Sequence, residues 1–265
     1  MKILIVGASG LVGSHLFAEA QARRHDQNYP MAVSTDGMKD GGLKRLKDAL
    51  DEGWHPDAVI HSAGFTHVEG CEADPTRCSD ENYHQPIRLA GVCGELGIRF
   101  CYISSAYAVF PEINAYAYSK ALAEIVLLGN PSTLIPRLMA VWGKDAKEKC
   151  FPFTVKRVAD SGVTLRVPSD QFCQPTWAGD AASWIISLIE ARESGIWNLA
   201  SEHPMARDEW ARQCVPMAKI TPCLTADLNP TVRRPLDCRM DCSRIQTRFP
   251  LATRHPSKFL ETIAP

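Results

Sequence analysis

Residues 1–16, MKILIVGASGLVGSHL, join a short aliphatic run to three closely spaced glycines. The run at residues 2–6 is typical of a buried parallel strand. Gly7 permits a tight turn off that strand, Gly10 lets the backbone approach a pyrophosphate, and Gly13 lets the next helix pack closely. The N–H groups that open this helix favour phosphate binding. A glycine turn with a purely structural role is the alternative, but the position between a strand and a helix predicts a Rossmann-type dinucleotide site.

Beyond this turn, apolar periodicity predicts strands and helices in alternation. We expect strands at residues 31–35, 57–63, 98–104, 133–139, 163–167 and 195–200, and helices at residues 10–24, 43–50, 75–94, 116–128, 151–160 and 180–192. This order predicts an α/β fold, a Rossmann doubly wound parallel sheet with a small C-terminal substrate-binding lobe. We expect the NAD(P)-binding domain at residues 1–143, joined by the strand near 195–200, and mainly the lobe at residues 144–265.

The composition of the 265-residue chain argues against several classes of protein. Hydrophobic residues make up 45%, charged residues 22%, and the net charge of −1 gives no general attraction to nucleic acid or membranes. No apolar run reaches the roughly 18–20 residues of a membrane span, and the N-terminal run is too short for a signal peptide. We therefore expect a cytoplasmic protein. The ten cysteines lack CxxC spacing, so we expect reduced thiols and no metal site.

A second motif, Asn114-Ala-Tyr116-Ala-Tyr118-Ser-Lys120, lies on an expected helix. Tyr116 and Lys120 share one face of that helix, whereas Tyr118 points elsewhere. Because a nearby ammonium favours the phenolate, we expect the pKa of Tyr116 to fall toward the working pH. A solvated helix face with chance spacing is the alternative, but the motif together with the glycine turn predicts catalysis.

These motifs resemble the extended short-chain dehydrogenase/reductase superfamily, which has the GxxGxxG turn and the YxxxK pair. Further segments resemble its dTDP-4-dehydrorhamnose reductase-like branch over nearly the whole chain. They are DAVIHSAGFT (57–66), VEGCEADP (68–75) followed by Asn82, RLMAVWG (137–143), DQFCQPTWAGD (170–180), GIWNLA (195–200) and RRPLD (233–237).

The resemblance implies roles for individual residues. Catalysis is assigned to Tyr116, Lys120 and Ser105. Cofactor binding is assigned to Gly7, Ser9, Gly10, Leu11, Val12, Gly13, Ser62, Ala63, Gly64, Tyr116 and Lys120. Substrate binding is assigned to Thr66, Ser105, Trp142, Gln174, Arg233 and Arg234.

Two pairs of charged residues have open alternatives. Arg233 and Arg234 either clamp a diphosphate bidentately or form surface ion pairs. For Glu69 and Glu72, a role as helix N-terminal charges is favoured over substrate contact.

The segment after the glycine turn is shorter than in the family, so the residue that contacts the adenosine ribose is unassigned. Asp36 would suggest NAD, and Arg23 or Arg24 would support the 2′-phosphate of NADP. We favour NADP over NAD, because reductive biosynthetic relatives use it.

Two further departures concern the reaction centre. The loop between Ser105 and Tyr116 is short, and either Ser105 or Ala106 takes the position of the catalytic hydroxyl. The tryptophan that lies next to the sugar in the family is replaced by Ala140, and Trp142 stands two residues on.

The resemblance implies an NAD(P)H-dependent reductase of a ketone, with a nucleotide-linked 4-keto-6-deoxysugar as the favoured substrate. The alternatives are a sugar-nucleotide epimerase or dehydratase and a non-catalytic NAD(P)-binding regulatory subunit. A dehydratase would need an acidic pair beside the tyrosine, which Ser105-Ala106-Tyr107 does not supply. The expected partner is a small-molecule sugar nucleotide, with no nucleic acid or membrane, and a homodimer is left open.

Overall fold

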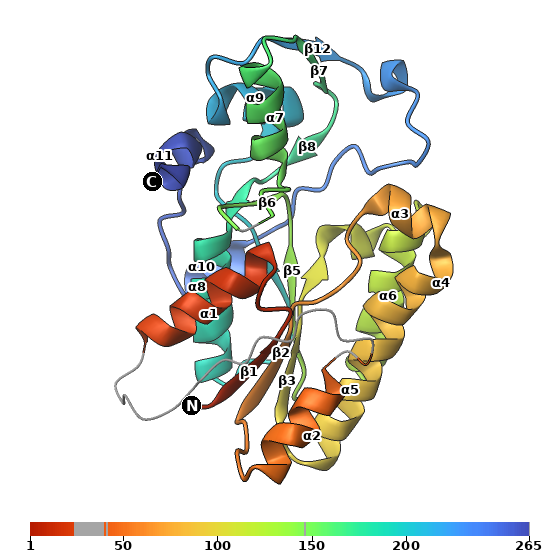
Figure 1. The fold of residues 1–265 in the computed structure, drawn as a ribbon, viewed down its shortest axis with the longest axis vertical. Helices are drawn as coiled ribbons and strands as arrows, with labels where there is room; N and C mark the ends of the chain where they lie inside the picture. Colours follow the sequence, from red (N-terminus) through yellow and green to blue (C-terminus); the bar gives the residue numbers. More distant parts are fainter. Residues whose placement is uncertain (24–39, 41, 146, 265) are drawn as a thin grey trace.

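The structure, a computed structural model, describes residues 1–23, 40, 42–145 and 147–264. Its centre is a parallel sheet (Figure 1). Across the sheet the strands lie in the order β1 (Ile3–Val6), β2 (Ala58–His61), β3 (Arg99–Tyr102), β5 (Leu134–Leu138) and β10 (Gly195–Leu199). The short strand β4 (Ser104–Ser105) also pairs with β5. Because all these pairs are parallel, the carboxyl ends of the strands lie at one edge of the sheet.

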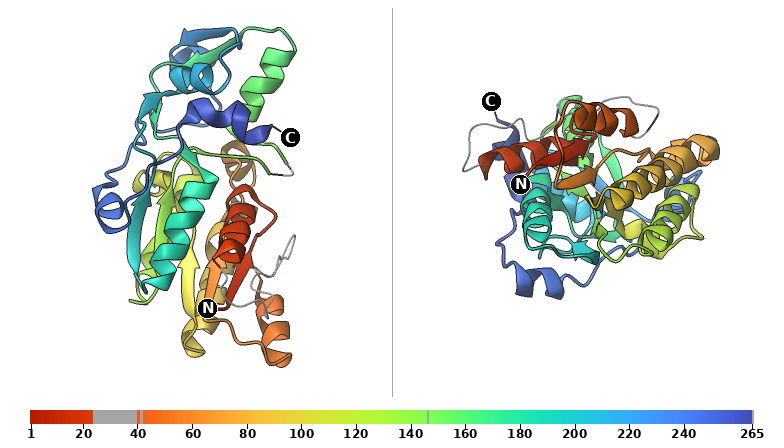
Figure 2. Two further views of the ribbon diagram at one scale, coloured as in Figure 1. Left: turned by 90° about the vertical axis from the view of Figure 1, so that its left-hand side faces the viewer. Right: turned by 90° about the horizontal axis from the view of Figure 1, so that it is seen from below.

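Helices cover both faces of this sheet, as the view from below in Figure 2 shows. Core packing places α1 (Leu11–Ala22), α8 (Ala178–Glu190) and α10 (Ser243–Arg248) on one face. On the other face lie α2 (Leu43–Asp51), α5 (Gln85–Glu95) and α6 (Ala115–Leu127). The expected doubly wound α/β fold is therefore confirmed.

A second apolar core lies in a lobe beyond the carboxyl ends of the strands (Figures 1 and 2). The lobe contains α7 (Phe151–Asp160), β7 (Leu165–Pro168), α9 (Arg207–Cys214), β12 (Ile220–Cys223) and α11 (Phe259–Ile263). Trp142, Phe153, Trp210 and Phe259 are among its fully or nearly fully buried side chains. Because β10 pairs with β5 along its whole length, residues late in the chain also complete the sheet.

Shorter elements join these layers. They are α3 (Val68–Ala73), α4 (Pro75–Ser79), a π-helical turn (Asp80–His84), β6 (Val141–Trp142), β8 (Phe172–Cys173), β9 (Thr176–Trp177), β11 (Met205–Ala206) and single 3₁₀ turns at Ala106–Val109, Thr225–Leu228 and Pro256–Lys258.

The predicted elements that fall on described residues are present, with small shifts at their ends. The strand expected at residues 98–104 is split into β3 and β4. The strand expected at residues 31–35, together with Arg24 and Asp36, lies outside the described residues. Within the described part of the chain, no helix is long and apolar enough to cross a membrane.

All ten cysteines are free thiols, eight of them buried and two half-buried. They occur in both regions of the molecule. Cys93 and Cys101 lie in the sheet layers, and Cys173 and Cys214 lie in the lobe core. The described residues hold no group of three or more His, Cys, Asp or Glu side chains arranged for a metal ion.

Candidate active site

The glycine turn has the close backbone contacts that its sequence predicts. Gly7 has a φ of +85°, and a Cβ atom there would lie 2.6 Å from the backbone N of Ala63. A Cβ on Gly13 would lie 2.1 Å from the carbonyl oxygen of Gly7. Gly10 is the N-cap of α1 and supplies no side-chain cap to the helix. The first-turn N–H groups of α1 lack intrahelical partners, so the turn, including Ser9, Leu11 and Val12, fits a dinucleotide phosphate.

The segment after β2 is tied to this turn. The hydroxyl of Ser62 donates to the carbonyl of Val6 at 2.8 Å, so this side chain has a structural bond. A Cβ on Gly64 would lie 2.7 Å from Oδ1 of Asn82, a fully buried side chain that bonds both the N–H and the carbonyl of Phe65. Thr66 follows and is exposed.

Helix α6 carries Tyr116 and Lys120 into the edge where the strands end. Asn114 caps this helix by accepting from the N–H of Ala117 at 2.8 Å. Tyr116 is nearly buried, and the side chain of Ser105 at the end of β4 lies close enough to its hydroxyl to lower its pKa. Lys120 is 3% exposed, and its Nζ donates to the carbonyl of Ile103 at 3.0 Å. The three residues assigned to catalysis therefore lie together.

The pKa of Tyr116 is shifted in the direction opposite to the expected one. Burial raises the pKa of Tyr116 above its ordinary value, although the neighbouring side chain of Ser105 opposes this shift. Burial also lowers the pKa of Lys120 to about 8. The expected lowering of the Tyr116 pKa is therefore wrong for this structure, because desolvation of the phenolate outweighs the other influences. Nζ of Lys120 instead lies 4.5 Å above the ring of Tyr102.

The structure also bears on two sequence alternatives. Ser105, not Ala106, is the residue whose side chain acts on Tyr116, while Ala106 is fully buried at the start of the following 3₁₀ turn. Tyr118 is 59% exposed, which agrees with its expected position on a different face of the helix.

A buried ionic network lies next to the group formed by Ser105, Tyr116 and Lys120. Glu124, one turn beyond Lys120, is 3% exposed and accepts from the hydroxyl of Ser104 at 2.5 Å. Arg137 on β5 donates to both carboxylate oxygens of Glu124. The network therefore ties α6 to β4 and β5 directly beside Ser105 and Lys120.

Two acidic residues near the site have structural partners. Glu69 on α3 forms an ion pair with Arg234 of the lobe at 2.6 Å. The carboxylate of Glu72 accepts from the N–H of Ala115 at 2.9 Å, so it caps α6 rather than its own helix. Arg233 is exposed, and its carbonyl accepts from Asn114 at 2.9 Å.

Two residues expected to bind substrate have partners within the protein. Trp142 is fully buried and packs edge-on against Phe259 in the lobe core, so the expected substrate contact is corrected to core packing. The amide of Gln174 donates to the carbonyl of Ser201 at 3.2 Å and accepts from the N–H of Met240 at 2.6 Å. Both ends of this amide are bonded to backbone and join three segments of the chain, and its role in substrate binding stays a prediction.

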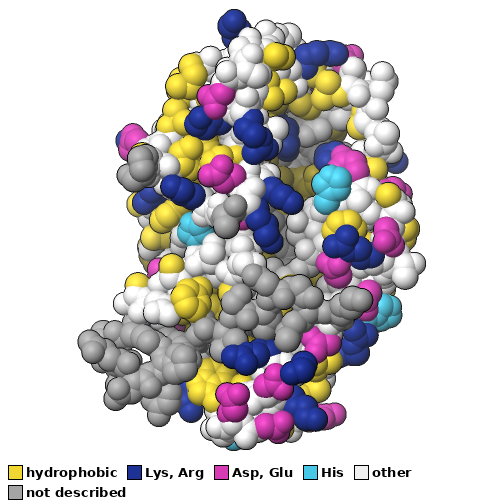
Figure 3. All heavy atoms as spheres, in the orientation of Figure 1, with side chains coloured by type: hydrophobic (Ala, Val, Ile, Leu, Met, Phe, Trp, Pro, Cys, Tyr) yellow, Lys and Arg dark blue, Asp and Glu magenta, His cyan; other side chains and the backbone are white. Residues whose placement is uncertain are grey.

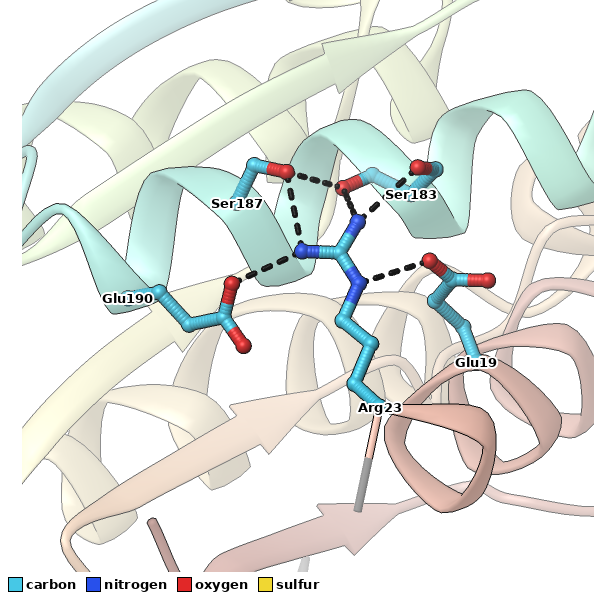
Figure 4. Close-up of polar contacts among 5 residues, drawn as sticks. All are labelled: Glu19, Arg23, Ser183, Ser187 and Glu190. Carbon is cyan, nitrogen blue, oxygen red and sulfur yellow. Dashed lines mark hydrogen bonds and ion pairs between the residues drawn. The ribbon is translucent and has the colours of Figure 1, made fainter. Parts of the chain in front are cut away.

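Arg23, which was a candidate for the 2′-phosphate of NADP, is held elsewhere (Figure 4). Its guanidinium pairs with Glu19 and with Glu190, each at 2.7 Å. It also donates to Ser183 and Ser187 on α8. Arg23 thus joins α1 to α8, and the expected phosphate role is corrected to a structural one.

Sequence reasoning missed one cationic residue beside the site. Arg207 lies at the start of α9, with its guanidinium 4.2 Å from the ring centroid of Phe151. No sequence motif includes Arg207. Among the described residues its guanidinium has no carboxylate partner, and a sequence does not reveal the lack of such a partner.

The fold and this Ser–Tyr–Lys group define a member of the extended short-chain dehydrogenase/reductase class. Comparison with known families narrows this: the chain belongs to the RmlD substrate binding domain family, whose sequence model matches residues 1–264. A probable low-salt glycan biosynthesis reductase of Haloferax volcanii is 26% identical over 93% of this chain and 91% of its own. A dTDP-4-dehydrorhamnose reductase of Mycolicibacterium smegmatis is 27% identical over 80% of this chain and 67% of its own.

Solved structures support the same fold. A dTDP-4-dehydrorhamnose reductase from Bacillus anthracis, in complex with NADP, superposes with a TM-score of 0.85 at 20% identity over 98% of both chains. One from Clostridium acetobutylicum has a TM-score of 0.84 at 23% identity over 99% of this chain and 98% of its own.

Proposed function

We propose that the protein is an NAD(P)H-dependent reductase of the ketone in a nucleotide-linked 4-keto-6-deoxysugar. The observation that carries this proposal is that Ser105, Tyr116 and Lys120 lie together at the edge where the strands end, with the side chain of Ser105 acting on the hydroxyl of Tyr116. A carbonyl oxygen that meets both hydroxyls accepts two hydrogen bonds at the atom where negative charge develops during reduction. The names of the relatives from Mycolicibacterium smegmatis and Haloferax volcanii support a reductase.

Each side chain of the group has a distinct part in this mechanism. Because burial holds the pKa of Tyr116 above its ordinary value, its hydroxyl keeps the proton near neutral pH and donates it to the ketone oxygen. Ser105 orients and polarises the carbonyl. Lys120, with a pKa lowered to about 8, is mostly an ammonium at neutral pH and stabilises the phenolate that Tyr116 becomes. When bound, a nicotinamide cofactor supplies the hydride.

We propose NADP as the preferred cofactor and NAD as the alternative. The glycine turn would hold the pyrophosphate through N–H groups of Leu11 and Val12, since the N–H of Gly10 donates to the carbonyl of Gly7, and Gly7 and Gly13 allow the close packing beneath it. Lys120 would hold the nicotinamide ribose. The relative from Bacillus anthracis that was solved with NADP supports this preference.

We also propose a homodimer. Exposed apolar side chains on α6 support it: Tyr118 is 59% and Ile125 69% exposed. Light scattering of the purified protein tests this, and a monomer at micromolar concentration would contradict it.

The reaction is tested by following cofactor oxidation with dTDP-4-dehydrorhamnose and related keto-sugar nucleotides. We expect turnover, and a loss of roughly a hundredfold or more in kcat for Tyr116→Phe, which lacks the donated proton. The matched control is Tyr118→Phe, two residues away on the exposed face, which should keep wild-type kcat. Turnover that survives in Tyr116→Phe would contradict the mechanism. Binding of cofactor without any turnover would favour the regulatory alternative, and isomerisation without net reduction would favour an epimerase.

A further inference from the structure

The lobe contains a cavity of about 400 Å³ between α7, β7 and the start of α9. Its described lining includes four cationic side chains, Lys149, Arg166, Arg207 and Arg234, and no carboxylate. Figure 3 shows several Lys and Arg side chains on this face of the lobe, beside the hollow that separates it from the sheet layers. A cavity lined by one sign of charge concentrates ligands of the opposite sign.

Arg207 is the most unusual member of this group. It is partly buried, and its guanidinium lies over Phe151. Among the described residues, no carboxylate and no carbonyl accepts a hydrogen bond from that guanidinium. Burial lowers the pKa of Arg207, and the positive charge of Arg234 lowers it further. A partly buried cation without an acid is costly to keep, so its donors are suited to an anion from outside the chain.

Arg207 lies on a continuous path from the reaction centre. The rings of Tyr116 and Tyr107 pack edge-on with centroids 5.9 Å apart. The charges of Arg234 and Arg207 both act on Tyr107, and both guanidinium groups line the cavity. A sugar nucleotide with its ketone at Tyr116 would therefore extend past Tyr107. The part of the substrate beyond the sugar would then reach the guanidinium groups of Arg207 and Arg234.

We propose that Arg207, together with Arg234, binds the diphosphate of the sugar nucleotide, an inference that rests on the proposed function for its substrate. Planar guanidinium groups match phosphate oxygens with paired donors, which a single ammonium does not do. Arg207 thus takes the place that the sequence suggested for Arg233, whose side chain is exposed. Arg234 is shared between the substrate and Glu69.

The test measures dTDP binding by calorimetry, which needs no turnover. We expect Arg207→Met to weaken dTDP binding about tenfold or more, because charge-assisted hydrogen bonds are lost, and to leave thymidine binding unchanged. Arg207→Lys, which keeps the charge but not the planar donors, should lie between Arg207→Met and wild type. It also keeps the test open if Arg207→Met fails to fold. The matched control, Arg157→Gln, removes a positive charge from the exposed face of α7 and should bind dTDP like wild type.

The outcomes separate this inference from the proposed function. Unchanged dTDP binding in Arg207→Met, equal weakening of dTDP and thymidine, or no dTDP binding by wild type overturns the inference. If wild type reduces the keto-sugar nucleotide while Arg207→Met keeps its KM, the function stands and the inference fails. If dTDP binding depends on Arg207 but no ketone is reduced, the inference stands and the proposed reaction fails.

Discussion

At the scale of single residues, the charge of Lys120 is set by opposing influences. Burial lowers its pKa to about 8, while the carboxylate of Glu124 raises it. The mechanism uses the ammonium form, so kcat/KM should fall as pH rises through about 8. Glu124→Gln removes the negative charge but keeps hydrogen-bonding groups, so we expect this alkaline limb to move to lower pH.

The measurement is a pH profile of kcat/KM for wild type and Glu124→Gln, with circular dichroism to check folding. Glu95→Gln makes the same change of charge on an exposed position of α5 and should leave the profile unchanged. An alkaline limb at the same pH in Glu124→Gln would show that Glu124 only supports the fold.

His61 on β2 predicts a pH dependence of stability. It is fully buried, and neither ring nitrogen has a hydrogen-bond partner among the described residues. Burial, followed by the charge of Lys120, lowers its pKa from 6.5 to about 3. Between these two pH values His61 binds a proton in the unfolded chain but not in the folded chain. Stability is therefore lost as pH falls from 6.5 toward 3.

At about 1.4 kcal/mol per pKa unit, this linkage amounts to roughly 4–5 kcal/mol. His61→Leu should reduce the acid dependence by this order and should not destabilise the protein at pH 7, since it removes unpaired buried polar atoms. Urea unfolding at a series of pH values measures both. An unchanged slope below pH 6.5 in His61→Leu would refute the assignment.

At the scale of elements, Arg23 joins the end of α1 to α8 (Figure 4). We expect Arg23→Ala to lower the free energy of unfolding by about 1–2 kcal/mol, because two ion pairs and the bonds to Ser183 and Ser187 are lost. We also expect the ratio of kcat/KM for NADPH and NADH to stay unchanged, since Arg23 is turned toward α8. Lys47→Ala, on the exposed face of α2, is the surface control. A shift of the ratio toward NADH would restore Arg23 as a phosphate ligand.

Contacts between residues far apart in the chain, such as those of Arg23 with α8, could not be predicted from the sequence. The glycine turn and the Tyr116–Lys120 pair were predictable, because short-range spacing and backbone geometry decide them. The burial of Trp142 was not, since it depends on Phe259, more than a hundred residues away. The same holds for Gln174, whose amide meets the backbone of Met240, and for the shift in the Tyr116 pKa, which follows from burial rather than from a neighbouring charge.

At the scale of the whole molecule, the sheet depends on residues late in the chain. Strand β10 pairs with β5 from Gly195 to Leu199, and Ile185 and Ile189 of α8 share a core with Leu16 of α1. A fragment of residues 1–143 lacks β10 and α8 and exposes the apolar face of α1. We expect it to unfold without a cooperative transition, whereas the full chain unfolds cooperatively in urea, as circular dichroism would show. A cooperative transition in the fragment would mean that residues 1–143 form an independent domain.

The distribution of the cysteines gives the chain its own set of reporters. Burial raises the pKa of Cys93 and Cys101 in the sheet layers and of Cys173 and Cys214 in the lobe, so the reactive thiolate is scarce at each. A thiol reagent then modifies each position only when its surroundings open. Pulsed alkylation followed by peptide mass spectrometry would therefore time the opening of the lobe and of the sheet separately in one unmodified protein.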